Sequence, residues 1–177
     1  MRAPCLCLRE EFSSMLGKTH LCGGLAVAAL ICSAGGLTAG QGMVCTAGCA
    51  FGSLFPDIDH KGSMLGQKVK PVSSVIGAVA GHRTLFHWFA PYLLLACVLH
   101  IGFPGWDMVT LSVLAGILSH LFLDALTPSG VPLYPGRKAH LLKIHTGSGI
   151  DKALGICLAV LAAGGFLKWA ISIFRGF

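Results

Sequence analysis

The feature that most limits how this chain can fold is a long run without a charged side chain, from Leu21 to Pro56. About 20 consecutive apolar residues suffice for a helix to cross a lipid bilayer. Across all 177 residues, 54% are hydrophobic and 11% are charged, whereas a soluble domain carries about 25% charged residues. This composition leaves too little polar surface to cover a soluble globule. The sequence therefore predicts an integral membrane protein.

Five apolar segments predict an all-α fold, a polytopic transmembrane helical bundle with one short member. They cover residues 21–40, 43–55, 84–103, 107–126 and 152–174. The second is short for a full crossing, and Pro91 interrupts the third in its first turns. Polar connections at 57–81 and 128–149 separate them. We expect residues 15–177 to form a single membrane-embedded domain, and residues 1–14, which precede a second methionine, to be a non-essential tail.

The distribution of basic residues predicts the orientation. In an alternating bundle, the N-terminus and both polar connections lie on the same side of the membrane. All of the 13 Lys and Arg residues except Lys168 and Arg175 fall on that side. The positive-inside rule makes it cytoplasmic, so we expect a cytoplasmic N-terminus, with anionic lipid headgroups as the counter-charge. No basic nucleic-acid-binding motif occurs, so nucleic acid is not an expected partner.

Histidine and aspartate side chains gather towards this same side, from four segments that are separate in the sequence. The candidate metal ligands are His20, Asp57, Asp59, His60, His82, His87, His120 and Asp124. Imidazole and carboxylate together bind Zn²⁺, Mn²⁺ or Fe²⁺. Ionisable groups inside a membrane segment are costly and usually functional. The candidates exceed one tetrahedral shell, but two ions about 3.5–4 Å apart with a bridging Asp would use them.

Further assignments follow from spacing and residue type. His120 and Asp124 are four residues apart and share a helix face. Arg83 is suited to bind a phosphate or a developing negative charge. An Asp outside the first shell could accept a proton from water, so we assign Asp59, Arg83 and His87 to catalysis.

Other polar residues have simpler interpretations. We expect His100 and Asp107 to lie at the opposite membrane interface. Ser148 or Asp151 is expected to cap the last helix near its N-terminus.

Three motifs resemble one known family. They are "LFPDIDH", "GHRTLFH" and "SHLFLDALTPSGVPLYPG", and they resemble the YdjM-like, or DUF457, family of bacterial inner-membrane proteins. These proteins are described as membrane-bound metal-dependent hydrolases, and a phospholipase-like activity is suggested for them. The resemblance covers roughly residues 15–165 and implies a multi-pass protein of the bacterial inner membrane. Its pattern maps onto all eight candidate ligands and Arg83. Family members often have a Phe-Thr pair before the His that corresponds to His87 and a Ser after it. This chain has Leu85-Phe86 before His87 and Trp88 after it.

Together these features predict a membrane-bound hydrolase that acts on a lipid or phosphoester at the cytoplasmic face. We expect one or two divalent ions, with Zn²⁺ first and Mn²⁺ or Fe²⁺ as alternatives, and membrane lipid as both environment and substrate. One alternative is a metal-ion or proton-coupled transporter, but no internal repeat is present, and transporters place ionisable groups near mid-bilayer. Another is a non-catalytic scaffold in which a metal staples the helices together.

Overall fold

The computed structural model describes residues 13–59, 63–71, 73–74, 87–128, 130–134 and 137–175. Within these residues it contains five α-helices: α2 (Ser13–Gly35), α3 (Ala39–Leu54), α5 (Phe89–Gly102), α6 (Asp107–Ala125) and α7 (Gly149–Arg175). Two short 3₁₀ helices, η1 (Pro56–Asp59) and η2 (Pro104–Trp106), and one hairpin, β1 (Val131–Tyr134) with β2 (Arg137–Ala139), complete the described elements. The predicted all-α bundle is confirmed.

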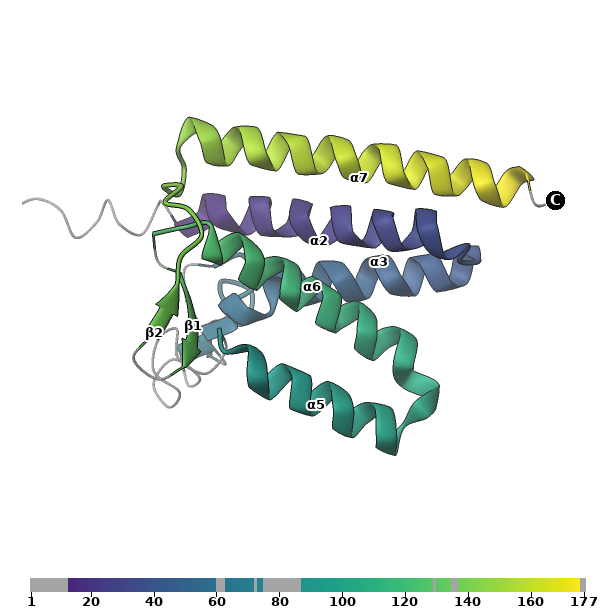
Figure 1. The fold of residues 1–177 in the computed structure, drawn as a ribbon, viewed down its shortest axis with the longest axis horizontal. Coiled ribbons are helices and arrows are strands. Elements are labelled where there is room, and N and C mark those ends of the chain that lie inside the picture. Colours follow the sequence, from purple (N-terminus) through teal and green to yellow (C-terminus); the bar gives the residue numbers. More distant parts are fainter. Residues whose placement is uncertain are drawn as a thin grey trace, which may run out of the picture.

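Consecutive helices run in opposite directions along the bundle (Figure 1). One end holds η1, the hairpin, and the starts of α2, α5 and α7, while α7 finishes at the other end. This is the alternation on which the predicted orientation depends.

Three helical stretches are long and apolar enough to cross a membrane, namely Gly17–Gly35, Pro104–Ala125 and Gly149–Arg175. Helix α3 has 16 residues and α5 has 14. The prediction of one short member was therefore wrong, because two members are short.

Helix α2 begins at Ser13, and not at the start of the apolar run. The predicted start at residue 21 was wrong because a charge marks the edge of an apolar segment, not the end of a helix. Lys18 is exposed, so its long side chain can reach water from within a helical turn. His20 consequently lies two turns inside α2, and not at its start.

Helix α5 begins at Phe89, later than predicted, with Trp88 in an extended conformation in front of it. His87 therefore precedes the helix and does not open it. Pro91 is the third helical residue and does not interrupt the helix, because the first turn has no intrahelical partner for its missing N–H. Residues 84–86 lie outside the described residues.

The 128–149 connection contains the β1–β2 hairpin, which the sequence analysis did not predict. It also pairs with the end of α6. The backbone N–H of Leu141 donates to the carbonyl of Ala125 over 2.8 Å, and that of Ile144 donates to Leu126 over 2.9 Å. Carbonyls in the last turn of a helix have no intrahelical partner, so these two bonds fix the connection against the helix that carries His120 and Asp124.

Helices α3 and α6 approach each other very closely. A Cβ atom at Gly52 would collide with the carbonyl of Val113, and one at Gly116 would collide with the carbonyl of Cys49. Small residues allow such an approach in lipid, where packing drives association more than the hydrophobic effect does. The contact brings the last turn of α3, which contains Ser53, beside the second half of α6.

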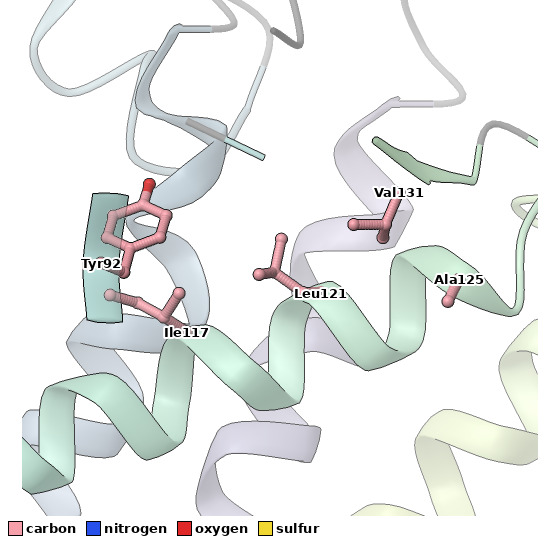
Figure 2. Packing of buried hydrophobic residues seen from close by; sticks show 5 residues of the cluster. All are labelled: Tyr92, Ile117, Leu121, Ala125 and Val131. Atoms are coloured by element: carbon pink, nitrogen blue, oxygen red, sulfur yellow. The ribbon is translucent and has the colours of Figure 1, made fainter. Parts of the chain in front are cut away.

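A cluster of buried hydrophobic side chains lies along one face of α6. Ile117, Leu121 and Ala125 follow each other at intervals of four residues, and they face Tyr92 of α5 and Val131 of β1 (Figure 2). Residues spaced by four share a helix face. This packing holds α5 and the hairpin at the end of the bundle where the candidate ligands lie.

Candidate metal centre

Two candidate ligands on α6 lie one turn apart and point into the bundle. His120 and Asp124 are no more than 2% exposed, and His120 Nε2 lies 3.5 Å from Asp124 Oδ2. The other oxygen of Asp124, Oδ1, lies 3.4 Å from Nε2 of His20 on α2. The rings of His20 and His120 stack with their centroids 3.9 Å apart. The shared face predicted for His120 and Asp124 is confirmed.

Two more candidate ligands reach the same place from the ends of other elements. His87 lies just before α5, and its Nε2 is 3.3 Å from Asp124 Oδ2 and 3.5 Å from Asp57 Oδ1. Asp57 lies in η1, where Pro56 cannot continue the hydrogen bonds of α3 and the chain turns. Asp57 Oδ1 also lies 3.8 Å from His120 Nε2.

A backbone carbonyl fixes the orientation of His120. Its Nδ1 lies 2.7 Å from the carbonyl oxygen of Ser53, in the last turn of α3. A carbonyl can only accept, so Nδ1 must carry the proton, and the neutral ring then has its lone pair on Nε2. Metal-binding histidines almost always donate their second ring N–H to a carbonyl, a carboxylate or water. Nε2 of His120 is therefore held ready to ligate, facing the two aspartates.

The described residues contain two groups that could hold a metal ion. One is His20, His120 and Asp124, and the other is Asp57, His87 and His120, with the ligand atoms of each group within 4.8 Å of one another. The groups share His120, and Asp124 also contacts His87. The five side chains thus form one continuous cluster that could hold one ion or two.

Unpartnered nitrogen atoms indicate that the cluster suits a metal ion. Both ring nitrogens of His20 and of His87 are buried and make no hydrogen bond, and the same is true of His120 Nε2. A buried polar group without a partner costs about 1–3 kcal/mol. Lone pairs of imidazole and carboxylate converging in this way match the donor set of a first-row divalent ion.

Two of the candidate ligands, Asp57 and His87, lie outside the membrane-spanning helices and influence each other's protonation. Burial would raise the pKa of Asp57, but the His87 imidazole 3.5 Å away and the nearby imidazoles of His120 and His20 outweigh it and lower the pKa to about 2. Burial would likewise lower the pKa of His87, but Asp124 and Asp57 outweigh it and raise the pKa to about 9. The raised pKa favours a protonated His87 between the two carboxylates, and a metal ion that binds here would displace this proton.

Not every predicted site residue joins this cluster. Asp59, the last residue of η1, is buried but belongs to neither group of candidate ligands. His60, His82 and Arg83 lie outside the described residues, so their roles stay predictions. His100 and Asp107 form an exposed pair with Nδ1 and Oδ1 2.8 Å apart, at the α5–α6 connection.

The sequence analysis did not predict the contribution of Ser53, and it predicted only a capping role for Asp151. Ser53 acts through its backbone carbonyl, and no side-chain pattern reports that. Ser148 caps α7, as one of the two expected candidates, since its Oγ accepts from the backbone N–H of Asp151 over 3.2 Å. Asp151 Oδ2 accepts from the N–H of Gly147, before the helix, over 2.8 Å. Its Oδ1 also accepts a 2.9 Å hydrogen bond from Thr19 Oγ1, one residue before His20.

Comparison with known proteins identifies the family. A family model described as YdjM inner membrane protein matches residues 15–175. The chain belongs to this family. The predicted inner-membrane location agrees with this membership and with the three membrane-length helices, while the orientation of the N-terminus stays a prediction.

Curated relatives agree with the assignment to the YdjM family. The chain is 35% identical to the uncharacterized protein YvsG of Bacillus subtilis over 120 residues, which are 67% of this chain and 72% of YvsG. It is 39% identical to the inner membrane protein YdjM of Escherichia coli over 115 residues, 60% of this chain and 58% of that protein, and the YdjM of Shigella flexneri matches equally. The match thus spans less than two thirds of the YdjM proteins' own length. No solved structure matches the chain.

Proposed function

We propose that this protein is a membrane-bound metal-dependent hydrolase that cleaves a phosphoester of a lipid at the cytoplasmic face of the inner membrane. The observation that carries the proposal is His120, whose Nδ1 lies 2.7 Å from a backbone carbonyl oxygen while its unpartnered Nε2 faces the carboxylates of Asp57 and Asp124. A purely structural histidine in a membrane helix would be expected to use both nitrogens in hydrogen bonds.

The proposed ligands are His20, Asp57, His87, His120 and Asp124. Nitrogen and oxygen donors of this kind favour Zn²⁺, with Mn²⁺ or Fe²⁺ as alternatives. Asp124 directs one oxygen at His20 and the other at His87 and His120, which supports a bridging role if two ions bind. A divalent ion held here would lower the pKa of water and polarise the scissile phosphoester.

The depth of the cluster supports a substrate at the lipid headgroups. His120 lies five residues before α6 ends at Ala125, which corresponds to about 8 Å along the helix axis. The site is therefore near one end of the bundle and not at its middle, where transporters place their binding sites.

One side of the cluster is open to water and substrate. Asp57 is 16% exposed in its side chain, whereas the other four ligands are at most 2% exposed. The substrate would therefore approach from the side of η1. Asp59 follows Asp57 on η1 and is our candidate for the group that accepts a proton from water. Arg83 is proposed to bind the phosphate, and His87 to contact the reacting group while it ligates.

The proposal is tested on purified protein in lipid nanodiscs. Metal content is measured by elemental analysis, and product release is followed with a panel of labelled phospholipids. We expect stoichiometric metal and hydrolysis of at least one phospholipid. Asp124→Asn should lose both, while the exposed His145→Ala should keep both. A protein that contains no metal after supplementation would refute the proposal.

The near-complete burial of four ligands favours a second candidate, a metal-stapled scaffold without catalysis. A closed shell leaves no position for water. Removal of the metal would then lower the unfolding temperature, and no phospholipid of the panel would be hydrolysed by the metal-loaded protein. That combination of results would replace the hydrolase with the scaffold.

A further inference from the structure

A small cavity is lined by both His20 and Asp151. Its volume is about 20 Å³, and one water molecule needs about 10–15 Å³. Leu126 and Leu154 are among the aliphatic side chains that line it. The polar residues of the lining are Thr19, His20, Thr127, Thr146 and Asp151. They come from α2, from just after α6, from the segment that leads into α7, and from the first turn of α7.

Nδ1 of His20, which lines this cavity, lacks a hydrogen-bond acceptor. Its Nε2 faces Asp124 Oδ1 at 3.4 Å, and the two ring nitrogens of an imidazole point in widely different directions. Nδ1 therefore points away from the carboxylate, and it is buried without a partner. Nδ1 of His120 donates to the carbonyl of Ser53. Among the described residues, no backbone carbonyl accepts a hydrogen bond from Nδ1 of His20.

The cavity offers a carboxylate for this purpose. Asp151 is 6% exposed, and it accepts one hydrogen bond at each oxygen, from Thr19 and from the N–H of Gly147. A carboxylate has about four acceptor positions, so Asp151 can accept at least one more hydrogen bond. A water molecule in the cavity could accept from His20 Nδ1–H and donate to Asp151.

We propose that Asp151 is a positioning residue of the metal centre, which orients His20 as a ligand through one water molecule held in this cavity. Carboxylate–histidine–metal arrangements fix the ring tautomer and raise the basicity of the ligand. The inference rests on the proposed metal centre. It adds a carboxylate from the last helix, so that α7 contributes to a site whose ligands all come from other elements.

Cobalt binding provides the test, because Co²⁺ replaces Zn²⁺ and its visible spectrum reports ligand geometry. The full-length protein in nanodiscs is titrated with Co²⁺ as wild type and as Asp151→Asn, which keeps the side-chain shape and removes the charge. We expect about 10- to 100-fold weaker Co²⁺ binding, and an altered absorption per bound ion at saturation. A merely structural role would reduce the folded fraction and leave the spectrum per bound ion unchanged.

The matched control is Ser148→Ala, which removes a capping hydroxyl at the same helix end and leaves Asp151 in place. It should bind Co²⁺ like the wild type and with the same spectrum. A second variant, Thr146→Ile, adds bulk at the cavity wall and should weaken binding like Asp151→Asn by excluding the water. This variant tests the inference even if Asp151→Asn does not fold.

The outcomes separate the inference from the proposal on which it rests. Wild-type affinity and spectrum in both Asp151→Asn and Thr146→Ile would overturn the role of Asp151 while the metal centre stands. Equal weakening in Ser148→Ala and Asp151→Asn would assign the effect to the helix end and overturn it too. A wild-type protein that binds no Co²⁺, Zn²⁺ or Mn²⁺ would overturn the metal centre and the inference together.

Discussion

Replacing Gly52 by alanine should show how strictly the metal centre depends on the contact between α3 and α6. A Cβ atom at position 52 would meet the backbone of Val113 and lie 3.1 Å from the backbone nitrogen of Ile117. Neither obstacle is a flexible side chain, so α3 would have to move away from α6. Ser53 follows immediately, and its carbonyl would then withdraw from Nδ1 of His120.

The expected cost combines three terms. Overpacking of a well-packed interface costs about 1–3 kcal/mol, and loss of the Ser53–His120 hydrogen bond adds about 0.5–1.5 kcal/mol. Alanine recovers about 1 kcal/mol of helix propensity over glycine. The net loss of stability is about 0.5–3.5 kcal/mol. Loss of the bond that orients His120 should also weaken metal binding about 10- to 100-fold.

Gly40→Ala is the matched control, because Gly40 lies on the same helix with nothing within 4 Å of its added Cβ. Thermal unfolding and Co²⁺ titration in nanodiscs measure the two effects. Gly40→Ala should unfold at or above the wild-type temperature and bind Co²⁺ normally, whereas Gly52→Ala should be impaired in both assays. If the two variants behave alike, the close approach of α3 and α6 does not hold His120 in place.

Four further predictions concern the site and the topology. Asp124→Asn should reduce bound metal more than any other single variant because its two oxygens face three histidines, and His145→Ala serves as the control in elemental analysis. Arg83→Ala should retain metal and lose about 10- to 100-fold in rate, since an arginine cannot ligate but can bind phosphate; equal loss of metal would contradict this role. The pKa of His87 is about 9 without metal, so its proton must leave when a metal ion binds. The apparent Co²⁺ affinity should therefore fall about tenfold from pH 8 to pH 7. Equal affinities at the two pH values would refute this coupling. Reporter domains fused within residues 57–81 and at the C-terminus should report opposite compartments, because α5, α6 and α7 lie between them. A shared compartment would mean that one of these three helices does not cross.

The positions of the candidate ligands along the bundle could be predicted from the sequence. Charge-free runs define the helices, and alternation of helices then places His20, Asp57, His87 and Asp124 at one end. The α-helical period puts His120 on the face of Asp124. These inferences need only spacing and the position of each residue relative to an apolar run, which is why they are confirmed.

The rest depends on contacts that spacing does not encode. Every residue has a backbone carbonyl, so residue type could not predict that the carbonyl of Ser53 is the acceptor for His120. The hydrogen bond between Asp151 and Thr19 joins the first and last described helices, which are far apart in the sequence. It was not predicted because a capping role near Ser148 already accounted for Asp151. The hairpin after α6 was missed because a proline inside a short segment, here Pro132, is more typical of an irregular loop than of a strand.

The unequal lengths of the helices have a consequence for the surrounding lipid. Helix α7 has 27 residues and α5 has 14, which correspond to about 40 Å and about 21 Å along their axes. A bilayer has a hydrocarbon core of about 30 Å, so α7 must tilt or protrude, while the leaflets beside α5 must thin. The hydrophobic mismatch is therefore opposite on the two sides of the molecule. We expect phosphate groups to lie deeper beside α5 than beside α7, and so nearer to His87.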